Sequence, residues 1–321
     1  MSWLTHMRSS RYTPPTPAQK LTAVSADGAR IQVEVHGSEQ APTVVLAHGW
    51  TCRIGFWAPV TRALAVDHRV VLYDQRGHGS SPLAPIPGGY STRVLADDLQ
   101  AVLETALQDG ERAVVAGHSM GGMSVLAAAD REAVRKRAAA VLLCSTASSR
   151  LLSDSRVVPL RSPRLRTRVH RALLGTRAPL GPVTPLSKQI LKYVTMSPGA
   201  TREMVEACAH VVHACPTAVR AGWARVLADL DLTPQVTRLS MPTAVLVGTA
   251  DRLTPPEHAR RMAAALPRCV GLTELPGLGH MTPLEAPQTV AGAVRSLVHD
   301  HLTAPATEPV NQRSTFKDGR G

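Results

Sequence analysis

Residues 113–130, AVVAGHSMGGMSVLAAAD, constrain the fold of this chain more than any other stretch. The first five residues are a short apolar run, and those from Met120 onward are small, apolar helix formers. The segment therefore predicts a strand, an abrupt turn at Ser119 and a helix. Gly117 and Gly121 flank this serine, and since neither carries a Cβ, strand and helix can approach closely around the turn.

Strands and helices alternate on both sides of this segment. Buried apolar strands are predicted at 43–47, 69–73, 113–117, 138–144, 243–248 and 270–275. Helical periodicity lies between or after them, at 56–66, 92–107, 120–129, 256–266 and 286–302. An N-terminal hairpin adds two strands, at 20–25 and 30–36. This order predicts an α/β fold with a doubly wound, mostly parallel eight-stranded sheet flanked by helices.

The alternation stops between Ser145 and Leu239, where only proline-punctuated helical pieces occur. We interpret this stretch as an all-helical cap inserted over the carboxyl edge of the sheet. The predicted domains are a flexible or loosely draped N-terminal arm (1–18), an α/β core (19–148 and 236–302), a helical cap (149–235) and a disordered C-terminal tail (303–321).

The composition narrows the location and the partners. The formal net charge is +12, but the arginines are scattered, without zinc-ligand spacing or a long basic tract, so no nucleic-acid partner is expected. Five cysteines without a C-x-x-C pair favour a reducing cytoplasm. No signal peptide or stretch of about 20 apolar residues is present, which predicts no transmembrane segment. The arginines at 161–171 are interpreted as a solvated helix face, and the alternatives are peripheral contact with an anionic interface and recognition of a CoA-like substrate.

Ser119 requires a base to become a nucleophile, and that base is expected to be a histidine oriented by a carboxylate. In an open α/β sheet these groups come from loops at the carboxyl ends of strands. Asp251 follows the strand at 243–248, and His280 follows the strand at 270–275. Each has an ordinary structural explanation, a helix N-cap for the aspartate and a solvated turn for the histidine. Ser119, Asp251 and His280 follow one another in the chain order nucleophile, acid and base, which favours the catalytic interpretation.

Other residues are placed around this trio. The backbone N–H groups of Trp50 and Met120 are candidates for an oxyanion hole, and Trp50, His118 and Met281 are candidates for the substrate pocket. We expect His48, His78 and His118 to brace loops. We also expect Asp74 and Arg76 to tie their loop to its neighbours, and Asp97 and Asp98 to face solvent. His210 and His213 lack a third ligand, so neither a metal site nor a cofactor is expected.

As an ordered set, five motifs resemble the α/β-hydrolase fold family, in its cap-bearing, esterase-like and haloperoxidase-like branch. They are HGW at 48–50, DQRGHGSS at 74–81, GHSMGG at 117–122, GTADRLTP at 248–255 and GLGHM at 277–281. Many relatives carry proline shortly after the His-Gly pair, where this chain has Thr51 and Cys52. Relatives that act on epoxides or haloalkanes use aspartate at the position of Ser119, so the resemblance implies acyl transfer to water.

The sequence thus predicts a serine hydrolase of small, partly apolar carboxylic esters, acting through a Ser-His-Asp triad and an acyl-enzyme. The alternatives on the same triad are a lipase or monoacylglycerol-type enzyme, a thioesterase, a carbon–carbon bond hydrolase and a cofactor-free perhydrolase. An alternative of another class is a slow-turnover ligand receptor on a hydrolase scaffold. Neither the physiological substrate nor the oligomeric state follows from the sequence.

Overall fold

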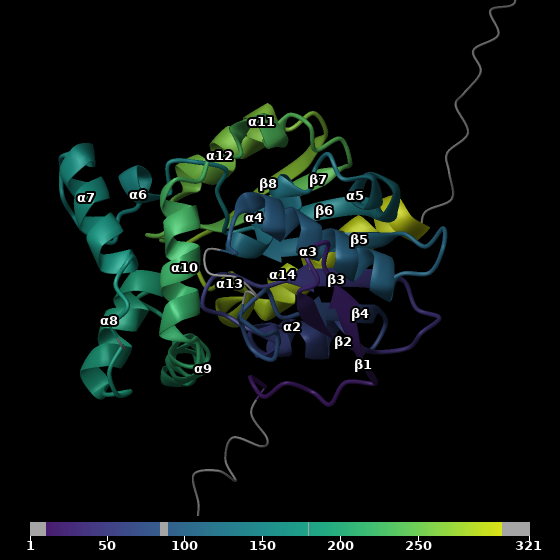
Figure 1. Cartoon of the computed structure of the whole chain (residues 1–321), viewed down its shortest axis with the longest axis horizontal. Helices are drawn as coiled ribbons and strands as arrows, with labels where there is room; N and C mark the ends of the chain where they lie inside the picture. Colours follow the sequence, from purple (N-terminus) through teal and green to yellow (C-terminus); the bar gives the residue numbers. More distant parts are fainter. Residues whose placement is uncertain (1–10, 84–88, 179, 304–321) are drawn as a thin grey trace, which may run out of the picture.

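The protein is built on one eight-stranded sheet (Figure 1). Its structure is a computed structural model, which describes residues 11–83, 89–178 and 180–303. The strand order is β1-β2-β4-β3-β5-β6-β7-β8. The strands are β1 (Gln19–Val24), β2 (Arg30–His36), β3 (Thr43–Ala47), β4 (Arg69–Tyr73), β5 (Ala113–His118), β6 (Ala138–Cys144), β7 (Thr243–Gly248) and β8 (Cys269–Leu275). β2 is antiparallel to both of its neighbours, β1 and β4, and all the other strand pairs are parallel. The predicted fold class is confirmed.

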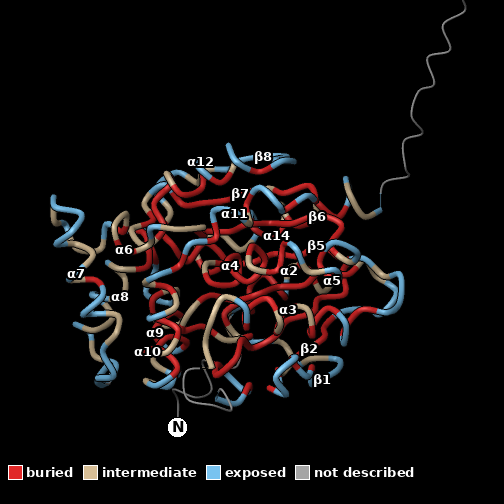
Figure 2. The backbone as a smooth tube through the Cα atoms, turned by 45° about the horizontal axis from the view of Figure 1, so that its top comes forward, coloured by how far each residue is buried: buried red, intermediate tan, exposed pale blue. Residues whose placement is uncertain are grey.

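Helices cover both faces of the sheet. One face packs against α2 (Ala58–Leu64) and α14 (Pro287–Val298). The other packs against α3 (Thr92–Ala106), α4 (Met120–Ala127) and α12 (Pro256–Ala265). Every residue of β3, β4, β5 and β6 is buried as a result. Figure 2 shows this buried centre in red, and β8 forms an edge whose first five residues are exposed.

Four short helices escaped the sequence analysis, α5 (Glu132–Arg137), α6 (Leu151–Asp154), α11 (Thr233–Val236) and α13 (Thr282–Glu285). Two other short elements overlap predicted helices: η1 (Ile54–Trp57) overlaps the helix predicted at 56–66, and the π-helical turn η2 (His299–Thr303) overlaps the helix predicted at 286–302. The longest of the four missed helices has six residues. Fewer than two helical turns do not give a readable periodicity, because the apolar residues recur only once.

The inserted segment forms the predicted helical cap, with α7 (Pro163–Leu174), α8 (Pro185–Thr195), α9 (Arg202–His213) and α10 (Thr217–Ala228) as its longer helices. In Figure 1, α7 and α8 lie farthest from the sheet, at the left, while α9 and α10 lie between them and the core. The boundaries 149 and 235 stay predictions. Of the two terminal segments, residues 1–10 and 304–321 lie outside the described residues. Residues 11–18 run along the core, where Arg62 donates to the Thr13 carbonyl.

Two indole N–H groups join the cap to the core. Trp223 on α10 is fully buried and donates from Nε1 to the Arg76 carbonyl at 3.0 Å. Trp50, in the loop after β3, donates from Nε1 to the Arg220 carbonyl at 3.1 Å. Because each bond satisfies a polar group at the junction, α10 has a fixed position over the carboxyl edge.

The expectation that Asp97 and Asp98 face solvent is wrong for Asp98, which is 3% exposed. Its carboxylate accepts from Arg76 Nη2 at 2.6 Å and from Nε at 3.1 Å. Asp27 binds the same guanidinium from its other side. Asp97 is partly buried and pairs with Arg131. Helical periodicity does place Asp98 on the inner face of α3, but the arginine that compensates its charge comes from a distant loop. Asp74 and Arg76 do tie their loop to neighbouring elements, as predicted.

Candidate active site

Ser119 lies at the turn between β5 and α4, directly above the carboxyl end of the strand. Its φ of 52° is in the left-handed region, a strained conformation for a residue with a side chain. A Cβ on Gly117 would overlap the Gly121 carbonyl, and a Cβ on Gly121 would overlap the Ala47 carbonyl. Both flanking glycines are therefore required by the close approach of strand, turn and helix.

Backbone and side-chain hydrogen bonds hold this turn. The Ser119 N–H donates to the Cys144 carbonyl at 3.0 Å, and Thr146 Oγ1 donates to the Ser119 carbonyl at 2.7 Å. In the described part of the chain, no hydrogen bond engages the Ser119 hydroxyl itself. The serine lines a cavity, so its hydroxyl is accessible to a ligand.

Asp251 and His280 are brought together from the loops after β7 and β8. His280 Nδ1 lies 2.7 Å from Asp251 Oδ2, and both side chains are buried. With Nδ1–H donating to the carboxylate, Nε2 is left as the acceptor nitrogen of the ring. Asp251 Oδ1 also accepts from the backbone N–H groups of Leu253 and Thr254 at 2.9 Å. One carboxylate oxygen thus stabilises the local turn and the other orients the imidazole.

Thr254 is a part of this cluster that the sequence analysis missed. Its Oγ1 donates to Asp251 Oδ2 at 2.8 Å and lies 3.2 Å from His280 Nδ1. The only sequence signal was the Asp-x-x-Thr spacing, which is also the pattern of an ordinary helix start. The hydroxyl adds a second contact to the carboxylate oxygen that faces the imidazole, and so it restricts the position of both groups.

The loop that carries His280 rests on the end of α8. The His280 N–H donates to the Thr195 carbonyl at 2.9 Å. Glu285 Oε2 accepts from the Ser197 N–H at 2.8 Å and from the Gly279 N–H at 3.3 Å. A Cβ on Gly279 would overlap the backbone of Met196. The cap and the imidazole therefore share one set of contacts.

The two candidate oxyanion donors lie at the ends of neighbouring strands. Trp50 follows β3 and Met120 follows β5, and these strands pair directly. Among the described residues, no loop, helix-end or side-chain hydrogen bond uses the backbone N–H of either residue. Met120 is the first residue of α4, where an N–H has no partner within the helix. Both amides are available for a ligand.

His48 and His78 brace loops, as the sequence predicted. His48 Nε2 accepts from the Gln75 N–H at 3.0 Å, while its Nδ1 contacts the Gly49 carbonyl at 2.8 Å. His78 Nε2 accepts from the Thr51 N–H at 3.2 Å. Burial lowers the pKa of His48 to about 3 and that of His78 to about 4. Each ring is neutral at pH 7, because a backbone donor requires its lone pair.

His118 packs next to His280 and contacts its backbone. Its Nε2 contacts the His280 carbonyl at 2.9 Å, and the two ring centroids are 5.0 Å apart. Phe56 also packs against His118, with a centroid distance of 4.7 Å. Burial holds the pKa of His118 well below its ordinary value. A neutral ring in this position supports the His280 loop without adding a positive charge beside it.

A cavity of about 480 Å³ lies between the cap and the carboxyl edge of the sheet. Ser119 and His280 line it, together with the three predicted pocket residues Trp50, His118 and Met281. Most of the remaining wall is aliphatic and comes from the cap, including Leu151, Leu152, Val157, Leu173, Leu174, Leu180, Ile190, Leu191 and Val194. The sequence could not define this wall, because its residues come from several helices without a shared motif.

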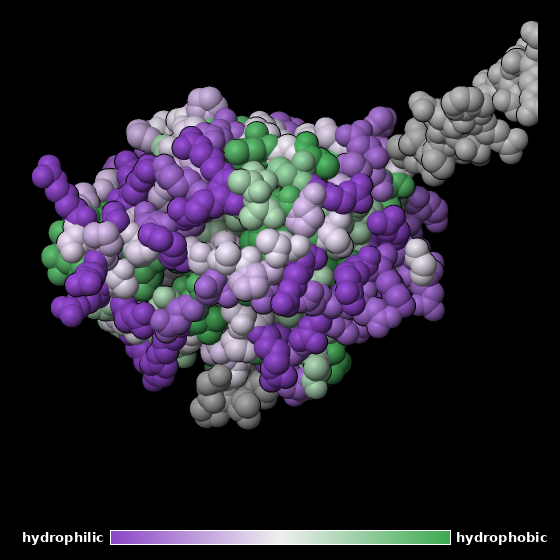
Figure 3. All heavy atoms as spheres, turned by 90° about the horizontal axis from the view of Figure 1, so that it is seen from above, coloured by the Kyte–Doolittle hydropathy of each residue, from purple (hydrophilic) through white to green (hydrophobic). Residues whose placement is uncertain are grey.

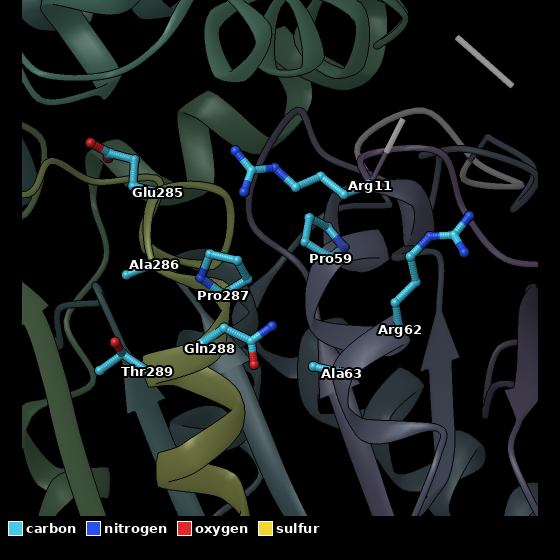
Figure 4. Close-up of a pocket in the computed structure, with 9 residues that line it drawn as sticks. All are labelled: Arg11, Pro59, Arg62, Ala63, Glu285, Ala286, Pro287, Gln288 and Thr289. Atoms are coloured by element: carbon cyan, nitrogen blue, oxygen red, sulfur yellow. The ribbon is translucent and has the colours of Figure 1, made fainter. Parts of the chain in front are cut away.

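A second hollow, of about 390 Å³, lies between α2 and α14 (Figure 4). Arg11 and Arg62 extend from one side, and Pro287 and Gln288 lie on the other. It contains none of the three triad candidates. The described residues also include no group of three or more His, Cys, Asp or Glu side chains placed to hold a metal ion. No helix within the described ranges is long and apolar enough to cross a bilayer.

Comparison with known proteins places these features in a family. A profile described as the alpha/beta hydrolase family matches residues 44–293. The probable oxidoreductase EphD of Mycobacterium tuberculosis is 27% identical over 296 residues, which cover 88% of this chain but only 50% of that protein. This chain therefore spans half the length of that relative.

Two further matches cover most of both chains. The putative carbamate hydrolase RutD of Variovorax paradoxus is 29% identical over 254 residues, covering 78% of this chain and 89% of that protein. The structure of a thermophilic esterase from Thermogutta terrifontis, with malate bound, superposes with a TM-score of 0.70. It is 26% identical and the match covers 88% of this chain and 98% of the esterase. The names of these proteins differ in chemistry, so the comparisons identify a family rather than a substrate.

Proposed function

Because this chain belongs to the alpha/beta hydrolase family, we propose that it hydrolyses carboxylic esters with Ser119 as the nucleophile. The observation that carries the proposal is the 2.7 Å contact between Asp251 and His280, in a cavity that the strained Ser119 also lines. A serine at a positive φ, a buried carboxylate–imidazole pair and two free amides supply the groups that acyl transfer requires.

The chemistry follows from these positions. Ser119 Oγ attacks the ester carbonyl carbon while His280 Nε2 accepts the hydroxyl proton. Asp251 stabilises the resulting imidazolium through Nδ1, and the N–H groups of Trp50 and Met120 bind the oxyanion. The imidazolium returns the proton to the leaving alcohol, and the acyl group stays on Oγ. Water then attacks the acyl-enzyme with His280 as its base, which releases the acid and restores the serine.

The cavity supports a substrate with an apolar acyl or alcohol part. Its aliphatic wall extends from the serine into the cap, and burying a hydrocarbon there gains about 25 cal/mol per Å² of area removed from water. We expect activity on soluble esters to rise as a short acyl chain is lengthened, until the cavity is filled. A p-nitrophenyl ester series measures this dependence, and a flat series would contradict an apolar acyl site.

Replacement of the nucleophile tests the central claim. Ser119→Ala should lower kcat for p-nitrophenyl acetate by about three orders of magnitude or more, with unchanged folding. Ser80→Ala, which removes an exposed hydroxyl from a loop, is the control and should leave kcat unchanged. A serine-directed fluorophosphonate should label the wild-type chain and not the Ser119 variant. Near-normal turnover by Ser119→Ala would refute the assignment, and a single slow turnover would favour the receptor alternative.

A further inference from the structure

Positive charge is concentrated in the outer half of the cap. Residues 155–201 contain seven arginines and two lysines but no aspartate or glutamate. The whole chain has a net charge of +12, so this segment carries most of the excess. Such a one-sided distribution differs from the mixed charges of an ordinary solvated surface.

Only part of this charge is neutralised by other elements. Arg156, Arg171 and Lys188 form ion pairs with Glu257, Asp229 and Glu206, respectively. Within the described residues, no ion pair involves the four exposed arginines Arg161, Arg164, Arg168 and Arg177. These four side chains are therefore available to an anionic surface.

The same helices expose apolar side chains to solvent. On α8, Leu186, Ile190 and Tyr193 recur at intervals of four and three residues, which places them on one helical face. Leu186 is 71% exposed and Ile190 is 56% exposed. The neighbouring exposed residues of the cap are Leu165, Leu173, Leu180 and Val183. An exposed apolar patch of this kind marks a surface that binds a membrane or another molecule.

We define the outer cap face as these seven apolar residues together with Arg161, Arg164, Arg168 and Arg177. It lies on α7, α8 and the segments next to them, and in Figure 1 these two helices are the elements farthest from the sheet. Figure 3 shows green apolar and purple hydrophilic side chains intermingled at this left end of the molecule. Leu173, Leu180 and Ile190 also line the cavity that contains Ser119. The face is thus continuous with the wall of the cavity.

We propose that the outer cap face docks on an anionic lipid surface, with its apolar side chains inserted among the acyl chains and its arginines against the phosphates. This combination of charge and apolar surface is that of an interfacial amphipathic helix. A second copy of the chain fits less well, because its own arginines would oppose these. A nucleic acid would satisfy the arginines but leave the leucines in water.

Vesicle binding by the full chain tests the proposal without reference to catalysis. The chain should co-sediment with vesicles of phosphatidylcholine and phosphatidylglycerol in equal parts, and much less with phosphatidylcholine alone. High salt should weaken the binding, because it screens the arginine–phosphate attraction. Equal binding to both vesicle types, or binding to neither, would overturn the proposal.

Two double variants separate the charged and the apolar contributions. Arg164→Gln with Arg168→Gln should weaken binding about thirtyfold, because each basic residue near an anionic membrane contributes about a factor of five. Arg135→Gln with Lys136→Gln, on α5 of the core, is the matched control and should have little effect. Equal weakening by both pairs would assign the binding to net charge alone.

Val183→Ser with Leu186→Ser should also reduce vesicle binding, whereas Val66→Ser on the core should not. None of these residues lines the cavity, so turnover of a soluble short-chain ester should be unchanged in each variant. If the wild-type chain forms a dimer without vesicles, and the Val183→Ser with Leu186→Ser variant does not, the face would be assigned to a second copy. If the wild-type chain binds DNA but not vesicles, and the same double variant still binds DNA, the arginines would be assigned to nucleic-acid binding. Either result would refute lipid docking.

Discussion

At the residue scale, Asp251 serves two purposes with its two oxygens. Oδ1 accepts the N–H groups that open the turn before α12, and Oδ2 faces His280 Nδ1. The two sequence interpretations, helix start and triad acid, were therefore not exclusive. A carboxylate is the only side chain of this size that accepts at both positions.

Asp251→Asn should accordingly lower kcat by about three to four orders of magnitude while changing stability little. The amide keeps one oxygen for the turn but presents N–H donors to His280, which favours the wrong tautomer for a base at Nε2. Steady-state hydrolysis of a soluble ester measures the effect. Asp109→Asn, at an exposed position, is the control, and a loss of less than tenfold in the Asp251 variant would exclude its role as the triad acid.

Buried neutral histidines should make the fold sensitive to acid. An unfolded chain takes up protons as pH falls through about 6.5, whereas burial lowers the pKa of His78 to about 4 in the folded protein. The folded state loses stability over this interval, by up to about 3 kcal/mol for this ring alone. His48, His118 and His258 act in the same direction. Burial raises the pKa of Asp74 to about 6, so this group stabilises the folded state as the pH falls.

The free energy of unfolding, measured by denaturant titration, should therefore fall between pH 6.5 and pH 4. Glutamine can also accept from the Thr51 N–H. His78→Gln should therefore reduce the slope of the unfolding free energy against pH by the equivalent of about one proton taken up on unfolding. His299→Gln, at an exposed ring, should not alter the slope. A wild-type stability that rises toward pH 4 would mean that the carboxylates outweigh the imidazoles.

At the element scale, the turn between β5 and α4 is specified by sterics. A comparison of two helical glycines, Gly121 and Gly292, shows this. A Cβ at residue 121 would overlap the Ala47 carbonyl of β3, whereas a Cβ at residue 292 in α14 meets no atom within 4 Å. The two positions are both helical glycines, so they share the same intrinsic helix propensity. They differ only in the space that surrounds them.

Gly121→Ala should lower the free energy of unfolding by about 1 to 3 kcal/mol, and it should also reduce ester turnover because the serine is displaced. Gly292→Ala should instead raise stability by about 0.5 to 1 kcal/mol, since alanine restricts the unfolded chain. Thermal or denaturant unfolding of both variants measures the difference. Equal effects at the two positions would remove the steric explanation of the turn.

At the scale of the whole molecule, hydrogen bonds from two indoles link the cap to the core, and we expect the two parts to unfold as one unit. Trp223 of α10 is fully buried against the core and bonds to the Arg76 carbonyl. Arg76 in turn neutralises Asp98 of α3 and Asp27 of the first hairpin. One loop therefore links the cap, a helix and the sheet edge through contacts that are far apart in the sequence.

Trp223→Phe tests this linkage. It keeps the aromatic packing but removes the indole N–H, and leaving the Arg76 carbonyl without a donor should cost about 1 to 3 kcal/mol. Tyr193→Phe, an exposed aromatic on the same cap, should change stability by less than about 0.5 kcal/mol. Denaturant unfolding should remain a single transition in both variants. A separate early transition for the cap in the wild type would contradict a single cooperative unit.

The sequence by itself determined the sheet, the order of its elements and the three triad candidates. Strand alternation, helical periodicity and the glycines around Ser119 are local properties, so they can be read without knowing which residues meet. Tertiary structure decided the partner of Asp98, the contacts of Thr254, the position of His118 next to His280 and the wall of the cavity. Each of these depends on groups brought together from different loops or helices, and their desolvation and packing exist only once the chain has folded.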